Sequence, residues 1–336
     1  MPHAVRGSAS SLVERSRALL DGIPRVWLLF YGLWAFLFTF LHFAANQENP
    51  EATLRALTDF EAPKPFQPRV LVPLLGSWLD LAVGRVIGLR SIYRVLDFIA
   101  CFGTLVTFSR LLRKTTALPN PQFGSLLLLY PMLWNYCVFG RLLYPYDIPA
   151  ILFFTLGLLA IAERRWHLFY VVFVVGGLNR ETICFLTVAY VASAWGKVAF
   201  RTLLGHVSLQ LALFAGLKLA LGWVFAENEG STVGFLLQRN LTALTSVNID
   251  TARLALAFGL LWVFIPLAWR KLPSFHRRLL WVVPAFVAAM TVFGLLSELR
   301  IYSELLPIVT VPAAILLSES LVSRPEAVTE SPVRAS

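Results

Sequence analysis

Four long apolar stretches constrain the fold of this chain more than any other feature of its sequence. They lie at 26–45, 203–225, 254–269 and 279–296, and three of them contain no charged residue. About 20 apolar residues in a helix cross the hydrocarbon of a bilayer. Only 14% of the chain is charged, against about a quarter in a typical soluble domain. The sequence therefore predicts an all-α, polytopic transmembrane bundle.

Shorter apolar stretches extend this interpretation to about ten crossings in a single transmembrane domain, 26–321. An external loop is expected at 46–69, and cytoplasmic, mostly disordered tails at 1–25 and 322–336. The sequence shows no cleavable secretion signal, since the first apolar run is long enough to remain as a span. The predicted crossings lie at 26–45, 95–112, 122–140, 147–162, 167–178, 183–196, 203–225, 252–269, 279–297 and 302–321.

The net charge of +10 is explained by this topology. Lys and Arg are retained preferentially in the cytoplasm, and an inside N-terminus gives an inner face of +11 and an outer face of −2, with Lys218 within a span. Binding to nucleic acid is therefore not needed to explain the surplus. A second arrangement, in which 70–90 crosses and 122–140 is re-entrant, fits the charge count equally well. Both arrangements place the polar motifs described below on the outer side.

The cysteines, histidines and glycine-rich segments of the sequence form no recognisable metal or cofactor motif. Cys101, Cys137 and Cys184 are scattered in apolar segments and fit neither a disulfide framework nor a zinc-site spacing. The five histidines are equally dispersed, and no P-loop or dinucleotide-binding motif is present.

Two carboxylates one residue apart, Asp59 and Glu61, follow the first apolar stretch in "TDFEAPKPFQPR". Such a pair can act as general base for an acceptor hydroxyl, or it can bind a divalent cation such as Mg²⁺ or Mn²⁺. The alternative is an ordinary solvated loop. We treat Asp59 and Glu61 as the candidate catalytic residues.

A polar turn, Asn179–Arg180–Glu181, separates two apolar segments of about 10–13 residues each. Helices of that length reach roughly 15–20 Å, whereas the hydrocarbon is about 30 Å thick. Irregular backbone at membrane depth occurs where it is buried in protein or lines a wet cavity. The pattern thus predicts short broken or re-entrant helices on the outer side, around an outward-facing cavity. A purely structural Arg180–Glu181 network is the alternative.

Three further outward motifs carry arginines beside carboxylates or tyrosines. Their alternatives are a snorkelling arginine and an aromatic belt. One guanidinium group can bind two phosphate oxygens at once, so we expect the motifs to converge on one phosphate-binding site. In particular, we expect Asp59, Arg69, Arg180 and Glu181 to line one cavity. The candidate substrate-binding residues are Arg69, Arg141, Tyr144, Tyr146, Asp147, Asn179, Arg180, Glu181, Arg300, Tyr302 and Glu304.

The chain resembles the GT-C class of membrane glycosyltransferases in its predicted ten spans and in the acidic Asp59–Glu61 motif on a long external loop after the first span. "PFQPRVLVPLL", "YPYDIPAILFF" and "LNRET" are also similar to segments of uncharacterised bacterial integral membrane proteins. The GT-C resemblance implies sugar transfer from a polyprenyl-phosphate carrier on the outer or luminal face, with Asp59 as base. It also implies that Arg69, Arg180 or Arg300 holds the lipid phosphate.

Three other functions remain open from the sequence. Broken helices and intramembrane charges also mark transporters and lipid flippases, although we find no inverted internal repeat. A polysaccharide polymerase-like protein would also use external arginines, and a non-catalytic scaffold of a cell-envelope assembly would use none of them. We expect a bacterial inner or plasma membrane location, with both termini cytoplasmic.

Overall fold

The computed structural model describes residues 22–83, 86–231, 234–245 and 249–322 of the 336-residue chain, and these are mostly helical. Nearly all of the two predicted tails lies outside the described residues. In the first half of the chain the elements are α2 (Arg25–Ala45), β1 (Gln47–Glu48), α3 (Leu54–Thr58), α4 (Leu71–Ala82), α5 (Leu89–Thr115), α6 (Pro121–Leu126), α7 (Leu129–Leu133), the π-helix η1 (Trp134–Val138), β2 (Leu142–Leu143) and α8 (Asp147–Glu163).

In the second half every described element is a helix. The elements are α9 (Trp166–Asn179), the 3₁₀ helix η2 (Glu181–Cys184), α10 (Phe185–Ala194), α11 (Phe200–Val224), α12 (Leu237–Thr245), α13 (Ile249–Ala255), η3 (Ala257–Val263), α14 (Phe264–Ala268), α15 (Ser274–Leu279), α16 (Val282–Phe293), η4 (Leu299–Leu305) and α17 (Leu306–Val322).

Five helical segments are long and apolar enough to cross a membrane. Three of them, Arg25–Ala45, Phe200–Val224 and Ser274–Phe293, leave most of their residues unburied: Leu219 and Trp223 of α11, for example, are 75% and 81% exposed. An exposed apolar face of this extent suits lipid, and the chain is accordingly consistent with a multi-pass membrane protein. The five segments are Arg25–Ala45, Leu89–Thr115, Phe200–Val224, Ser274–Phe293 and Leu299–Ser320.

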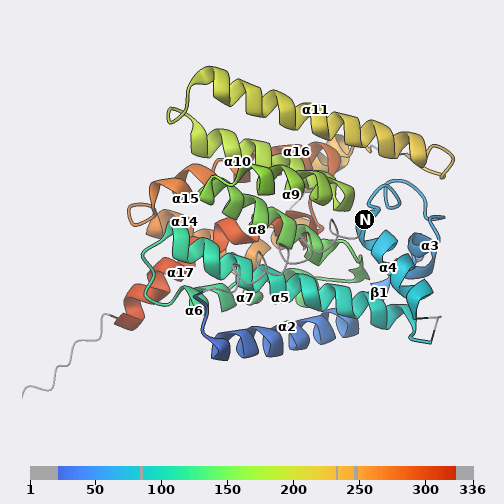
Figure 1. Cartoon of the computed structure of the whole chain (residues 1–336), viewed down its shortest axis with the longest axis horizontal. Coiled ribbons are helices and arrows are strands. Elements are labelled where there is room, and N and C mark those ends of the chain that lie inside the picture. The colour runs from blue at the N-terminus through green and yellow to red at the C-terminus, as the bar shows by residue number, and fades with distance from the viewer. Residues whose placement is uncertain (1–21, 84–85, 232–233, 246–248, 323–336) are drawn as a thin grey trace, which may run out of the picture.

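The bundle has two distinguishable ends. At one end β1 and β2 form a two-residue parallel pair, and we call this the strand end. At the opposite end the Arg110 guanidinium contacts the Glu163 carboxylate at 2.7 Å. Figure 1 shows α2, α5, α8, α9 and α11 running between these two ends in successive layers.

Helices α2 and α5 pack against each other in opposite directions. Arg90, near the start of α5, donates a 2.7 Å hydrogen bond to the carbonyl of Phe43, near the end of α2. At the opposite end Gly22 lies against the Arg113 side chain. Between them α4 has 12 residues, or about 18 Å of helix, which is too short for a straight crossing of the hydrocarbon. Helix α5 then returns the chain toward the opposite end.

The predicted break at Asn179–Arg180–Glu181 is present, and the predicted crossing 252–269 is itself interrupted. Helix α9 ends at Asn179, Arg180 adopts an extended conformation (φ −159°, ψ 146°), and η2 begins at Glu181. Within 252–269, a crossing predicted as one stretch, Phe258, Gly259 and Leu260 have φ of 59°, 60° and 65°. Left-handed backbone ends a right-handed helix, so this stretch divides into α13, η3 and α14.

The buried centre of the bundle contains α8 and α17. Phe154 and Leu158 of α8, like Val309 and Val311 of α17, are completely buried. Both helices begin at the strand end, where Asp147 is the first residue of α8 and η4 leads into α17. The two most deeply packed helices therefore both begin beside buried polar residues at the strand end.

Candidate functional site

Eight ionisable side chains at the strand end form two sets of ion pairs, which together we call the charge cluster. Four of them are cations and four are carboxylates, so their formal charges sum to zero. They come from five separate parts of the chain, all far apart in sequence. The members are Arg69, Asp147, Arg180, Glu181, Lys218, Glu298, Arg300 and Glu304.

The inner set is centred on Arg180, whose side chain is 5% exposed. Its Nη1 lies 3.4 Å from Asp147 Oδ1 and 3.4 Å from Glu304 Oε1, and both carboxylates are 1% exposed. Thr182 donates its hydroxyl to Glu304. Burying such charges is tolerable only when they are paired, and these three residues pair each other.

Arg300 extends the inner set toward the surface. Its Nη1 lies 3.2 Å from Asp147 Oδ2, and its Nη2 donates a 2.8 Å hydrogen bond to Glu298. Glu298 is 34% exposed, whereas Arg300 is 12% exposed. Asp147 is therefore shared by two guanidinium groups, and Glu298 forms the solvent-facing limit of this set.

The outer set is built around Glu181. Its carboxylate accepts a 3.1 Å hydrogen bond from Arg69 Nε and lies 3.5 Å from Lys218 Nζ. Burial alone would lower the pKa of Arg69, but Glu181 and then Tyr146 outweigh burial, so the Arg69 pKa is raised above its ordinary value. Arg69 thus stays charged.

Two tyrosines join the two sets. Arg69 Nη1 donates a 3.1 Å hydrogen bond to the Tyr146 hydroxyl, and its guanidinium lies 4.8 Å from the ring centre. Arg300 lies 3.7 Å from the Tyr144 ring centre, and the two rings are 5.7 Å apart. Burial raises the pKa of Tyr144 to about 12, although Arg300 opposes that shift. Both guanidinium groups are therefore held against aromatic faces, an attractive arrangement.

Local backbone interactions bring these residues together. The pairing of Gln47 with Leu142 places the segment 142–146 beside the chain that leaves α2. Asn179 Nδ2 donates a 2.9 Å hydrogen bond to the Tyr146 carbonyl, which ties the break after α9 to the start of α8. Arg180 and Glu181 consequently lie beside Asp147.

Several buried polar atoms beside the cluster have no hydrogen-bond partner among the described residues. They are Tyr136 Oη, Asn179 Oδ1, Ser303 Oγ and Glu304 Oε2. Buried polar atoms in proteins are nearly always bonded to protein or to water. The interior of the site therefore has donors and acceptors available for water or for a polar ligand.

Most of the predicted substrate-binding residues meet in this cluster, but two do not. The side chain of Arg141 is exposed, and the residue takes part through its carbonyl, which accepts from Gln47 N at 3.1 Å. Tyr302 is 1% exposed and packs 6.3 Å from the Phe286 ring in the apolar core. The substrate-binding roles predicted for Arg141 and Tyr302 stay predictions.

The predicted catalytic pair lies beside the cluster, in a separate group. Asp59 and Glu61 are exposed, and Asp59 Oδ1 is 3.7 Å from Arg55, which also binds Asp80 at 3.1 Å. Gln67 donates to the Leu57 carbonyl at 3.3 Å, so the end of α3 adjoins the loop that carries Arg69. Within the described ranges no hydrogen bond or ion pair joins Asp59 or Glu61 to the charge cluster, and their shared cavity with Arg180 stays a prediction.

A second buried ionisable pair was not predicted from the sequence. His42 of α2 and Asp97 of α5 approach to 3.3 Å, with side chains 1% and 4% exposed, and Thr39 donates a 3.0 Å hydrogen bond to Asp97. The Tyr136 ring lies 5.3 Å from His42. An acidic residue inside an apolar stretch is the signal that would have identified this pair.

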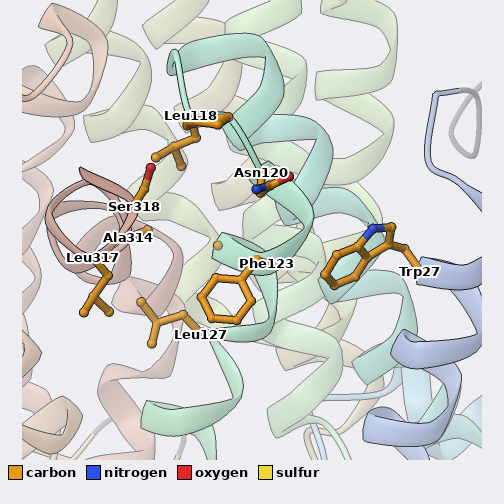
Figure 2. Close-up of a pocket in the computed structure, with 10 residues that line it drawn as sticks. Trp27, Leu118, Asn120, Phe123, Leu127, Ala314, Leu317 and Ser318 are labelled. Carbon is orange, nitrogen blue, oxygen red and sulfur yellow. The ribbon is translucent and has the colours of Figure 1, made fainter. Parts of the chain in front are cut away.

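An apolar groove of about 270 Å³ lies toward the opposite end, between α2, α6 and α17 (Figure 2). Asn120 and Ser318 are polar, but none of the lining side chains is ionisable. Among the residues that the structure describes, no group of three or more His, Cys, Asp or Glu side chains is placed to hold a metal ion. The chemically equipped region is therefore the charge cluster.

No protein-family model matches the chain, and its comparison with curated proteins and with solved structures gives no significant match. The resemblance to GT-C glycosyltransferases stays a prediction.

Proposed function

We propose that this protein is an integral membrane glycosyltransferase that moves a sugar from a polyprenyl-phosphate carrier to an acceptor on the outer or luminal face. The observation that carries the proposal is the pair of partly exposed guanidinium groups, Arg69 and Arg300, held over Tyr146 and Tyr144 at one end of the bundle. Phosphate oxygens are favoured ligands of arginine.

The proposal includes ten membrane crossings, with the strand end outside and both termini cytoplasmic. Successive segments alternate between the two ends: Glu163, at the end of α8, pairs with Arg110, and Asn179, at the end of α9, binds the Tyr146 carbonyl. Lys218, near the end of α11, returns to Glu181. The bacterial plasma membrane is the expected location.

The chemistry requires a phosphate site and a base. An acceptor hydroxyl attacks the anomeric carbon, the bond from that carbon to the phosphate oxygen breaks, and the electron pair leaves on the phosphate. Arg69 and Arg300 stabilise the added negative charge. The hydroxyl proton passes to a carboxylate, and we assign this role to Asp59, which is 43% exposed and pairs with the 49% exposed Arg55. Asp147 and Glu304, at 1% exposed, are closed to an acceptor.

Transfer can be tested with the full chain in nanodiscs and a panel of radiolabelled polyprenyl-phosphate sugars. We expect one donor to lose its sugar, and the Arg300→Gln variant to reduce that loss by about two orders of magnitude. An enzyme of this kind must also hydrolyse or transfer its donor without a transmembrane gradient. If neither the wild type nor membranes overproducing it consume any lipid-linked sugar, the proposal fails.

The buried His42–Asp97 pair favours one alternative, a transporter or lipid flippase. Intramembrane ionisable pairs mark proton and ion pathways, and this pair lies between two of the long helices. Sealed vesicles distinguish the two functions: a flippase moves a labelled lipid between leaflets with no chemical change, whereas a glycosyltransferase changes the lipid's mass.

A further inference from the structure

Glu181 joins two cations that come from different parts of the molecule. Arg69 precedes α4, and Lys218 lies on α11, which packs at the edge of the bundle (Figure 1). At 37% exposed, Glu181 is the most accessible carboxylate of the charge cluster. Its two partners are less exposed, Arg69 at 16% and Lys218 at 24%, so Glu181 is the member of these pairs that can turn toward solvent when an anion enters.

Lys218 has binding capacity that Glu181 does not use. Its Nζ is buried, lies 3.5 Å from Glu181 Oε1, and has no hydrogen-bond partner among the described residues. An ammonium group has three donors. A phosphate group is larger than a carboxylate and carries more oxygens, so it can accept hydrogen bonds from Arg69 and Lys218 together.

We infer that Glu181 occupies, in the unliganded protein, the position of a substrate phosphate, and that a lipid-linked phosphate displaces it and binds between Arg69 and Lys218. The inference rests on the proposed function for the identity of the substrate. A sugar–phosphate diester carries one negative charge, so its exchange for the Glu181 carboxylate leaves the charge of the cluster unchanged. When the sugar leaves, the electron pair stays on the phosphate. Arg69 and Lys218 hold the resulting monoester, and Arg300, which keeps its own carboxylate partners, adds its charge from the Tyr144 side.

The other cations of the cluster are less suited to this exchange. Arg180 and Arg300 share Asp147, which is 1% exposed. Removing a buried partner of this kind is strongly unfavourable. The site between Arg69 and Lys218 is therefore the one that a ligand can enter without breaking the buried ion pairs.

Binding of polyprenyl monophosphate to the full chain in phosphatidylcholine nanodiscs tests the inference. Glu181→Gln removes the competing charge, so we expect an affinity about fivefold higher than that of the wild type. Arg69→Gln and Lys218→Gln should each lower the affinity at least about tenfold. Glu227→Gln is the matched control, because Glu227 is an exposed carboxylate just beyond α11, and its affinity should equal that of the wild type.

Weaker binding by Glu181→Gln, with a wild-type unfolding temperature, would overturn the inference, because it would mean that the carboxylate supports the ligand. If that variant is unstable, Glu181→Ala is measured instead, with the same expected gain. Inorganic phosphate is titrated in parallel. A higher affinity of Glu181→Gln for the lipid alone identifies a lipid-linked ligand, whereas a higher affinity for both shows that the site also binds free phosphate. This binding experiment measures no sugar transfer. If Glu181→Gln binds more tightly but the protein has no transferase activity, the phosphate site between Arg69 and Lys218 is supported and the proposed glycosyltransferase function is rejected.

Discussion

The Arg300 guanidinium carbon lies 3.7 Å from the centre of the Tyr144 ring, closer than the 4.8 Å between Arg69 and the Tyr146 ring. The Tyr144 ring also stacks on the Phe66 ring, with their centres 5.7 Å apart. Arg300 is thereby fixed by a ring from one element and by Asp147 from another. A guanidinium held in this way is preorganised for a planar, bidentate ligand.

Tyr144→Leu should lower donor kcat/KM about tenfold, because it removes a cation–ring contact worth roughly 1–2 kcal/mol when partly buried. Tyr144→Phe keeps the ring and loses only the hydrogen bond from Asn49 Nδ2 at 3.0 Å, so its kcat/KM should stay within about threefold of the wild type. Equal losses in the two variants would show that the hydroxyl, not the ring, is what matters.

Asp147→Asn should destabilise the folded protein by about 3–5 kcal/mol, because it leaves Arg300 without a buried counter-charge and Arg180 with Glu304 alone. Unfolding in detergent with a chemical denaturant measures this change. Glu298→Gln is the control within the same set: Glu298 also binds Arg300 but is 34% exposed, so its change should stay below about 1 kcal/mol. Comparable losses of stability in the two variants would contradict the distinction between the buried Asp147 and the partly exposed Glu298.

Asp59→Asn should lower the rate of sugar transfer by about 10²–10⁴-fold, the range typical of general-base catalysis. Its stability should barely change, since Asp59 is 43% exposed. Glu51→Gln is the nearby control, because Glu51 is an exposed carboxylate between β1 and α3, and its activity should resemble that of the wild type. If Asp59→Asn is fully active, the base lies elsewhere, and Glu61 and Glu181 are the next residues to change.

The membrane class and the convergence of the polar motifs could be predicted from the sequence. Both follow from large unfavourable free energies, those of exposing long apolar stretches to water and of leaving charges unpaired near the hydrocarbon. Apolar stretches of this length have few alternatives to a bilayer, and charges near apolar segments must find partners or water. Arg69, Asp147, Arg180, Glu181, Arg300 and Glu304, drawn from four motifs, do meet at one end.

The choice of partners could not be predicted. Arg180 and Glu181 are adjacent, and a structural network of both residues with their neighbours was one interpretation of the sequence. Arg180 has extended backbone, and successive side chains on extended backbone point in opposite directions. Arg180 accordingly turns inward to Asp147 and Glu304, and Glu181 turns outward to Arg69 and Lys218. Such a division depends on the backbone dihedral angles of Arg180 at a helix break, which no local sequence pattern specifies.

The His42–Asp97 pair provides the last prediction, because it separates the two functional hypotheses. If the protein is a glycosyltransferase, the pair holds α2 against α5, and Asp97→Asn should lower the free energy of unfolding by about 3 kcal/mol. The kcat of the folded fraction should then be unchanged, because Asp97 contacts no member of the charge cluster among the described residues. Thr39→Val removes only the 3.0 Å hydrogen bond to Asp97 and should cost about 1–3 kcal/mol. A flippase that moves protons through this pair would behave differently: Asp97→Asn would leave a folded protein whose lipid movement no longer depends on pH. Measuring unfolding, sugar transfer and lipid movement on the same three proteins decides between these outcomes.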